Sequence, residues 1–236
     1  MKTLLRVGVS LWFGAAAAAL AGDARRDIVG TEKKRYSQHK EELVIRDFFQ
    51  DRRGGFFLDV GAGQPISDNN TYYLEKHLAW TGIAVDALPE LAEKWRRKRA
   101  GARFFNFIVT DHAGTLDAFY RAELYGVSSV EKPKTGPGQR AIASEKIVVP
   151  ATTLTKLLDD NRVVQLDLLS MDIEGHEPKA LAGFDIERFQ PKLVCVESKP
   201  ANRAFLLEFF EKHGYQQLVR YLQYDTVNYY YAPARR

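Results

Sequence analysis

From Gly55 onward, short apolar runs alternate with segments in which apolar residues recur at helical spacing. Short apolar runs bounded by polar residues are typical of buried strands, and their alternation with helices is typical of βαβ units. We therefore predict an α/β fold built on a mainly parallel sheet. The predicted strands cover residues 56–60, 82–86, 103–109, 166–172 and 193–197.

Helices are predicted on both faces of this sheet. Residues 71–80 follow a polar cluster that can begin a helix, and residues 89–99 place apolar side chains at helical spacing. Residues 42–49 predict a short amphipathic helix, and residues 204–213 predict a helix that ends at Gly214. The tyrosine-rich runs after Gly214, which turn near residues 224–226, predict a C-terminal antiparallel hairpin.

The N-terminal segment has a different pattern. Lys2 and Arg6 precede an alanine-rich apolar stretch over residues 7–21, which is typical of a secretory signal. An uncleaved anchor, a helix packed on the domain and a misassigned start are the alternatives. We expect a signal peptide or signal anchor over residues 1–22, a connector and helix over 23–54, and the main domain over 55–236. A genuine signal predicts a secretory or membrane-associated protein, and a misassigned start predicts a cytoplasmic one.

Composition fits one globular domain with a short extension. The 236 residues are 45% hydrophobic and 27% charged, which disfavours both a disordered chain and a protein with many membrane spans. The net charge of +4 is modest, and the basic run at residues 96–99 falls where a predicted helix ends, a place that favours cations without any ligand. A nucleic-acid partner is therefore not expected.

The clearest chemical signal is the glycine turn that follows the first predicted strand, Gly61-Ala62-Gly63. Such a turn lets a ligand approach the backbone. A dinucleotide-binding fingerprint needs a small residue three positions after Gly63, where this chain has Ile66, so a nicotinamide-linked oxidoreductase is disfavoured. Asp86 ends the next predicted strand, where a carboxylate can accept both hydrogen bonds of a ribose diol. A nucleoside without a pyrophosphate fits this pattern.

Two further polar sites lie at the ends of predicted strands. Asp111 is placed where an adenine amino group can be read, although aspartate there also favours a turn. Asp172 and Glu174 would share one face if the chain stays extended to Gly175, so one can hold a cation and the other can orient a hydroxyl. No metal site is predicted, because these acids with His176 and Glu177 show no known ligand spacing.

Several ordered runs together resemble the FkbM family of methyltransferases. They are DVGAG (59–63), SDNNTYYLEK (67–76), TGIAVDALPEL (81–91), VSSV (127–130) and SMDIEGHE (170–177). The resemblance extends over residues 56–233, and several motifs in order are far more specific than one. It implies a class I methyltransferase fold, which is Rossmann-like, with S-adenosylmethionine as the cofactor.

The resemblance also implies roles for the residues at matching positions. Asp59, Gly61 and Gly63 would line the methionine side of the cofactor, and Asp86 would bind its ribose. Asp172 and Glu174 would face the methyl donor and the acceptor. Family members often carry glutamate in place of Asp86 and vary at the position of His176, so catalysis by His176 is not implied by the family. With the adenine contact added, the predicted cofactor-binding residues are Asp59, Gly61, Gly63, Asp86 and Asp111.

The expected reaction is methyl transfer to a hydroxyl oxygen of a glycan or a small molecule. Asp172, Glu174 and His176 are the predicted catalytic residues, because any of them can take the hydroxyl proton at the strand end. The alternative is a non-catalytic interaction protein that keeps this fold at a secretory membrane, attached through its N-terminus. Loss of the glycine turn or of Asp86 would favour that alternative, and both are intact.

Overall fold

The computed structural model describes residues 25–123, 126–132 and 142–234. The N-terminal segment that predicts a signal, and residues 133–140 of a loop rich in proline and glycine, lie outside this part. Among the described residues, no helix has the length and apolar character needed to cross a membrane.

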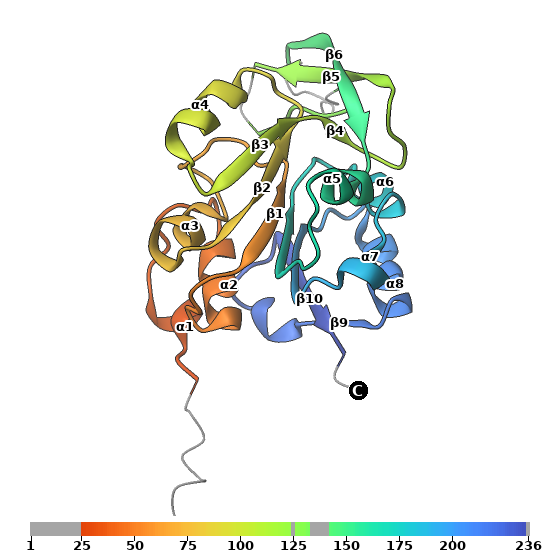
Figure 1. Cartoon of the computed structure of the whole chain (residues 1–236). Coiled ribbons are helices and arrows are strands. Elements are labelled where there is room, and N and C mark those ends of the chain that lie inside the picture. Colours follow the sequence, from red (N-terminus) through yellow and green to blue (C-terminus); the bar gives the residue numbers. More distant parts are fainter. Residues whose placement is uncertain (1–24, 124–125, 133–141, 235–236) are drawn as a thin grey trace, which may run out of the picture.

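A mainly parallel sheet lies at the centre of the described chain, as predicted (Figure 1). Its strand order is β3-β2-β1-β7-β8-β10-β9, in which β10 runs antiparallel to both neighbours and the other pairs are parallel. Strands buried on both faces need continuous apolar runs, which is why the sequence pattern locates them. The strands are β1 (Phe56–Val60), β2 (Thr81–Asp86), β3 (Ala102–Asn106), β7 (Leu168–Met171), β8 (Leu193–Glu197), β9 (Tyr215–Gln217) and β10 (Asn228–Pro233).

Helices cover both faces of this sheet, which confirms the predicted layers (Figure 1). Alternate side chains of a strand point to opposite faces, so Phe57 packs with one helical layer and Leu58 with the other. The first layer holds α1 (Ile28–Thr31), α2 (Glu41–Phe49), α3 (Tyr72–Leu78) and α4 (Leu91–Lys98). The second holds α5 (Leu154–Asp160), α6 (Glu177–Ala182), α7 (Ile186–Phe189) and α8 (Arg203–Lys212).

Helix α2 is part of the same core as the sheet. Its residues Leu43, Val44 and Ile45 are fully buried and pack in one cluster with side chains of β1, β7 and β8. Arg46 is buried as well, and its guanidinium forms ion pairs with Glu32 at 2.7 Å and Asp51 at 2.8 Å. The segment before β1 therefore contributes directly to the packing that positions the sheet.

A smaller second sheet lies above the carboxyl ends of the parallel strands (Figure 1). It consists of β4 (Ile108–Val109), β5 (Leu116–Ala122) and β6 (Ser144–Thr152). The prediction of one strand over residues 103–109 is wrong, because this segment forms two strands, β3 of the main sheet and β4 of the second sheet. The chain changes sheets after Phe107, whose N–H donates to the Asp86 carbonyl at 3.2 Å, and β4 then pairs with β6.

The C-terminal strands β9 and β10 pair antiparallel, as predicted. The connection between them is longer than a tight turn and contains a 3₁₀ helix, η1 (Val219–Tyr221). Tyr221 is buried there, and its hydroxyl donates to Asp47 of α2 at 2.8 Å. This hydrogen bond holds Tyr221 against α2, and Tyr221 lies in the 3₁₀ helix and not in the strand that the sequence pattern predicts.

Candidate active site

A cavity of about 400 Å³ lies where the carboxyl ends of β1, β2 and β7 meet the second sheet. Its volume falls within the range of pockets that bind small molecules. Ligands of open α/β sheets bind at this edge, so the position agrees with the expectation from the sequence. Six of the predicted residues line it: Gly61, Gly63, Asp86, Asp172, Glu174 and His176.

The glycine turn after β1 is fixed by close backbone contacts. Gly61 has a φ of +74°, and a Cβ at this position would lie 1.8 Å from the carbonyl oxygen of Asp172. Gly63 also has a positive φ, of +56°, and its carbonyl accepts a hydrogen bond from Trp95 Nε1 at 2.8 Å. Glycine at residue 61 therefore lets the turn pack directly against the loop that follows β7.

Asp86 connects the glycine turn to the loop after β2. One carboxylate oxygen accepts the Gly63 N–H at 2.9 Å and the other accepts the Leu88 N–H, also at 2.9 Å. Burial raises the pKa of Asp86 to about 6, although these two N–H groups favour the charged form. The carboxylate thus lies at the cavity wall with both oxygens oriented, as a group that holds a diol must be.

The loop after β7 is a turn, so the extended chain to Gly175, on which a shared face for Asp172 and Glu174 depended, does not form. β7 ends at Met171, Glu174 has a φ of +59° and Gly175 a φ of +94°. The turn forms because Glu177 accepts the N–H groups of Ile173 and Gly175. Asp172 and Glu174 still both line the cavity, but through this turn.

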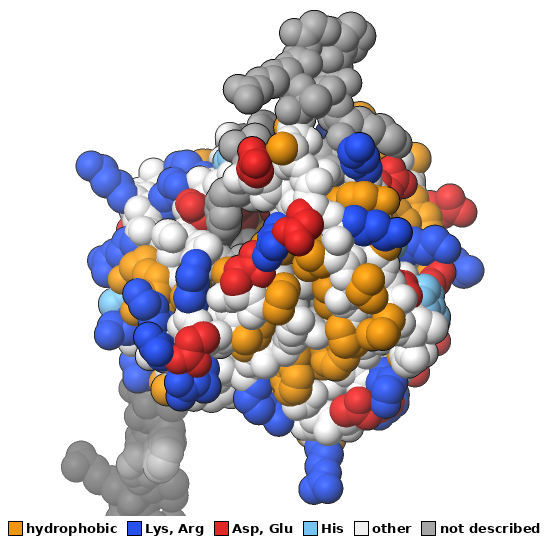
Figure 2. Space-filling model, turned by 90° about the horizontal axis from the view of Figure 1, so that it is seen from above, with side chains coloured by type: hydrophobic (Ala, Val, Ile, Leu, Met, Phe, Trp, Pro, Cys, Tyr) orange, Lys and Arg blue, Asp and Glu red, His pale blue; other side chains and the backbone are white. Residues whose placement is uncertain are grey.

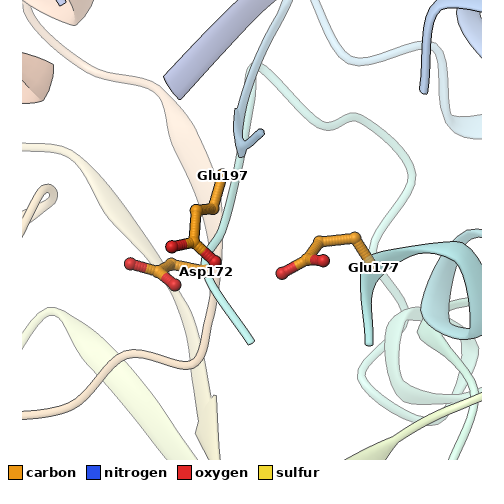
Figure 3. A group of neighbouring side chains, drawn as sticks. All are labelled: Asp172, Glu177 and Glu197. Atoms are coloured by element: carbon orange, nitrogen blue, oxygen red, sulfur yellow. The ribbon is translucent and has the colours of Figure 1, made fainter. Parts of the chain in front are cut away.

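Three carboxylates converge at the ends of β7 and β8. Oxygen atoms of Asp172, Glu177 and Glu197 lie within 4.8 Å of one another, with the Asp172 and Glu197 side chains side by side (Figure 3). Lys199 pairs with Glu174 and, at 3.1 Å, with Glu197. Asp172 has no ion pair or hydrogen-bonded side-chain partner in the described chain, and burial together with the neighbouring acids raises its pKa well above the usual range.

His176 lies where the cavity meets a shallower depression beside it. Its Nε2 is 3.2 Å from the Thr110 hydroxyl oxygen. Burial lowers the pKa of His176, so the imidazole is neutral near pH 7 and able to accept a proton.

Asp59 does not line the cavity, although the sequence placed it there. It is buried, and its carboxylate accepts the Thr71 hydroxyl at 2.8 Å and the Asn69 amide at 3.3 Å. The same Asn69 amide donates to the Ala62 carbonyl within the glycine turn, at 3.0 Å. Asp59 therefore stabilises the glycine turn through the Asn69 amide.

Asp111 lines the shallower depression and not the cavity, so the structure does not bring it together with the other predicted cofactor-binding residues. It accepts hydrogen bonds from Lys179 at 2.8 Å and His112 at 2.8 Å, and Lys179 and His112 hold its pKa far below the usual range. The physical reason is that β4 leaves the main sheet and carries Asp111 with it. The apolar Ile108 and Val109 line the cavity at this edge instead.

The structure adds cavity residues that the sequence analysis did not single out. Gln38 and His39 reach it from the segment before α2, and Phe119 and Arg121 from β5. Arg121 pairs with Glu145 on the neighbouring strand. Figure 2, which looks onto this end of the molecule, shows acidic, basic and hydrophobic side chains interleaved on the face. The sequence analysis predicts no strand over β5, because its largely exposed or half-buried residues give no regular alternation of apolar positions.

Comparison with protein families gives a match to the model described as the methyltransferase FkbM domain, over residues 59–216. The matched segment begins at Asp59, just before the glycine turn, and includes the loop after β7. No curated protein matches the chain.

Solved structures with a similar arrangement are distant in sequence. A precorrin-6y C5,15-methyltransferase from Geobacter metallireducens is 12% identical, with a TM-score of 0.48 over 86% of this chain and 93% of that one. A TehB-like S-adenosylmethionine-dependent methyltransferase from Corynebacterium glutamicum is 14% identical, with a TM-score of 0.41 over 80% and 77%. A 1,6-didemethyltoxoflavin-N1-methyltransferase from Burkholderia thailandensis, with bound S-adenosylhomocysteine, is 14% identical, with a TM-score of 0.36 over 81% and 74%.

Proposed function

The chain belongs to the FkbM methyltransferase family, and we propose that it transfers a methyl group to a hydroxyl oxygen of a glycan or a small molecule. Its fold is that of a class I methyltransferase and its cofactor is S-adenosylmethionine. The observation that carries the hydroxyl assignment is Asp172, an unpaired carboxylate in the described chain that shares its cavity with Asp86. A hydroxyl acceptor must lose a proton, and Asp172 at the cavity wall is the group that we propose accepts it.

The residues of the cavity fit S-adenosylmethionine. Asp86 offers two oriented oxygens for the ribose hydroxyls. The backbone of the turn at Gly61 and Gly63 can approach the methionine portion without side chains in between. Ile108 and Val109 provide an apolar wall for the adenine ring.

When bound, the cofactor supplies a methyl group on a positively charged sulfur, so the protein has mainly to align the acceptor and exclude water. Asp172 becomes easier to ionise once a cation lies in the cavity, because an opposite charge lowers a carboxyl pKa. Glu174 is held by Lys199 and contributes to the charge of the wall. His176, neutral and at the same wall, is the second group able to take the proton.

The Asp172→Asn variant tests this assignment. We expect turnover to fall by about 100-fold or more, because a positioned general base contributes on this scale, while affinity for S-adenosylhomocysteine is retained. The full chain is incubated with S-adenosylmethionine carrying a ¹³C-labelled methyl group and with panels of glycosides and small hydroxyl compounds. The carbon chemical shift of the product methyl distinguishes transfer to oxygen from transfer to nitrogen, carbon or sulfur.

Asp160→Asn is the matched control, since Asp160 lies on the exposed side of α5 and pairs only with Lys156 among the described residues. Product methyl groups on nitrogen or carbon would contradict the hydroxyl assignment. A wild-type protein that binds neither S-adenosylmethionine nor S-adenosylhomocysteine would favour the non-catalytic interaction protein.

Cofactor affinity is expected to fall as the pH decreases through about 6, because that is the pKa of Asp86. Above this pH the carboxylate is ionised and accepts the ribose hydroxyls, and below it the protonated form loses acceptor strength. Calorimetric titration of S-adenosylhomocysteine at several pH values across this range measures the effect. Asp86→Asn should bind weakly with a flatter pH dependence, and an unchanged dependence in this variant would assign the titration to another group.

A further inference from the structure

Glu177 is a buried acid near the cavity that accepts three hydrogen bonds. It begins α6, is fully buried, and does not line the cavity itself. Its Oε1 accepts the N–H groups of Ile173 at 3.1 Å and Gly175 at 3.2 Å. A single carboxylate oxygen thus holds the turn that presents Asp172 and Glu174.

The other oxygen of Glu177 reaches the loop after β8. Glu177 Oε2 accepts the Asn202 Nδ2 amide at 2.6 Å. Asn202 is buried just before α8, and its Nδ2 also lies 3.3 Å from the carbonyl oxygen of Glu197. The Glu177–Asn202 pair therefore ties the loop after β7 to the loop after β8.

These two loops carry groups that repel each other. Asp172 and Glu174 lie on one loop, and Glu197 ends β8 where the other loop begins. Only Lys199 is paired with them as a cation among the described residues. Carboxylates that lie close together in a partly buried place repel strongly. Glu174 also has a positive φ, which a residue other than glycine keeps only where its surroundings impose it.

We propose that Glu177 and Asn202 are positioning residues for methyl transfer: their hydrogen bond holds the two strand-end loops together and so keeps Asp172 beside Glu197 at the cavity wall. The inference rests on the proposed function, since it assigns the pair to that same site. Both side chains act through the loops, because neither lines the cavity.

Exchanging the two functional groups tests the pair. In Glu177→Gln the side-chain oxygen stays with the Ile173 and Gly175 N–H groups, so its NH₂ group faces the NH₂ group of Asn202, which can turn its own oxygen inward only by giving up the Glu197 carbonyl. Asn202→Asp places two carboxylates face to face. The double variant Glu177→Gln/Asn202→Asp restores one donor and one acceptor in reversed order. In full-chain protein, we expect each single variant to raise the hydrogen-exchange rate of the Ile173 and Gly175 amides and the Kd of S-adenosylhomocysteine roughly tenfold, and the double variant to restore both.

Asp167→Asn is the matched control for loss of a buried carboxylate. Asp167 precedes β7 at the opposite end of the strand, where it accepts the Phe56 N–H at 2.9 Å and pairs with Lys192 at 2.7 Å. This variant should lower the Tm without changing exchange at Ile173 and Gly175. If the Glu177–Asn202 pair had only a structural role, its single variants would likewise lower the Tm without changing exchange at Ile173 and Gly175. The double variant would then restore neither exchange nor affinity.

Failure of the proposed function and failure of the positioning role give different results. Absence of S-adenosylhomocysteine binding in the wild-type protein overturns the proposed function, while the exchange rates still report on the loops. Unchanged exchange and affinity in the single variants, or a double variant that does not recover, overturns the positioning role of Glu177 and Asn202.

Discussion

The Gly61→Ala variant is expected to unfold about 3 kcal/mol more easily than the wild-type protein and to lose cofactor binding. The added Cβ would lie 1.8 Å from the Asp172 carbonyl oxygen, and the φ of +74° disfavours any side chain. Relief of this overlap must separate the glycine turn from the loop after β7, which deforms the cavity from two sides. Denaturant unfolding and calorimetric titration of S-adenosylhomocysteine measure the two effects.

Gly54→Ala is the matched control because Gly54 has a similar φ, +68°, with no atom within 4 Å of an added Cβ. It should lose only about 1 kcal/mol of unfolding free energy, through backbone conformation, and keep its affinity for S-adenosylhomocysteine. Equal effects of the two substitutions would show that the contact between Gly61 and Asp172 is not the cause.

The Asp86→Ala variant is expected to bind S-adenosylhomocysteine about 100-fold or more weakly at neutral pH. Under the proposed ribose contact, two hydrogen bonds from hydroxyl groups to the carboxylate would be lost, and the N–H groups of Gly63 and Leu88 lose their acceptor. Calorimetric titration gives the change in Kd, and thermal unfolding shows whether the fold is retained.

The Asp111→Ala variant tests whether Asp111 contacts the cofactor, as the sequence predicts, or lies outside its site, as the structure indicates. Because Asp111 lies outside the cavity, its substitution should leave the Kd of S-adenosylhomocysteine within about twofold of the wild-type value. A loss comparable to that of Asp86→Ala would restore the adenine contact that the sequence predicted.

The sequence predicts the main sheet well where burial alone determines it. β1 and β8 begin and end at the predicted residues, since both are almost wholly buried and appear as continuous apolar runs. Asp86 and the glycine turn could be predicted from the sequence as well, because their positions follow from the ends of adjacent strands. Such features depend on short stretches of chain.

Features that depend on distant pairing were not predictable in this way. β5 and β6 pair across an intervening segment, and Pro150 interrupts the strand pattern. Because Leu116 and Val148 are exposed, apolar and polar residues do not alternate in a way that predicts a strand. Glu197 was placed correctly at the end of β8, but its proximity to Asp172 follows only from the adjacency of β7 and β8. Asp111 was misplaced because β4 belongs to another sheet.

The hairpin of β5 and β6 lies outside the parallel core but still contributes to the cavity. Val60, Gly61 and Asp86 line the cavity at the ends of the parallel strands, whereas Phe119 and Arg121 line it from β5. Substitutions or insertions in a peripheral hairpin leave the parallel core intact, and such segments tolerate variation. Under the proposed function, acceptor preference can therefore change through Phe119 and Arg121 while the glycine turn and Asp86 stay unaltered.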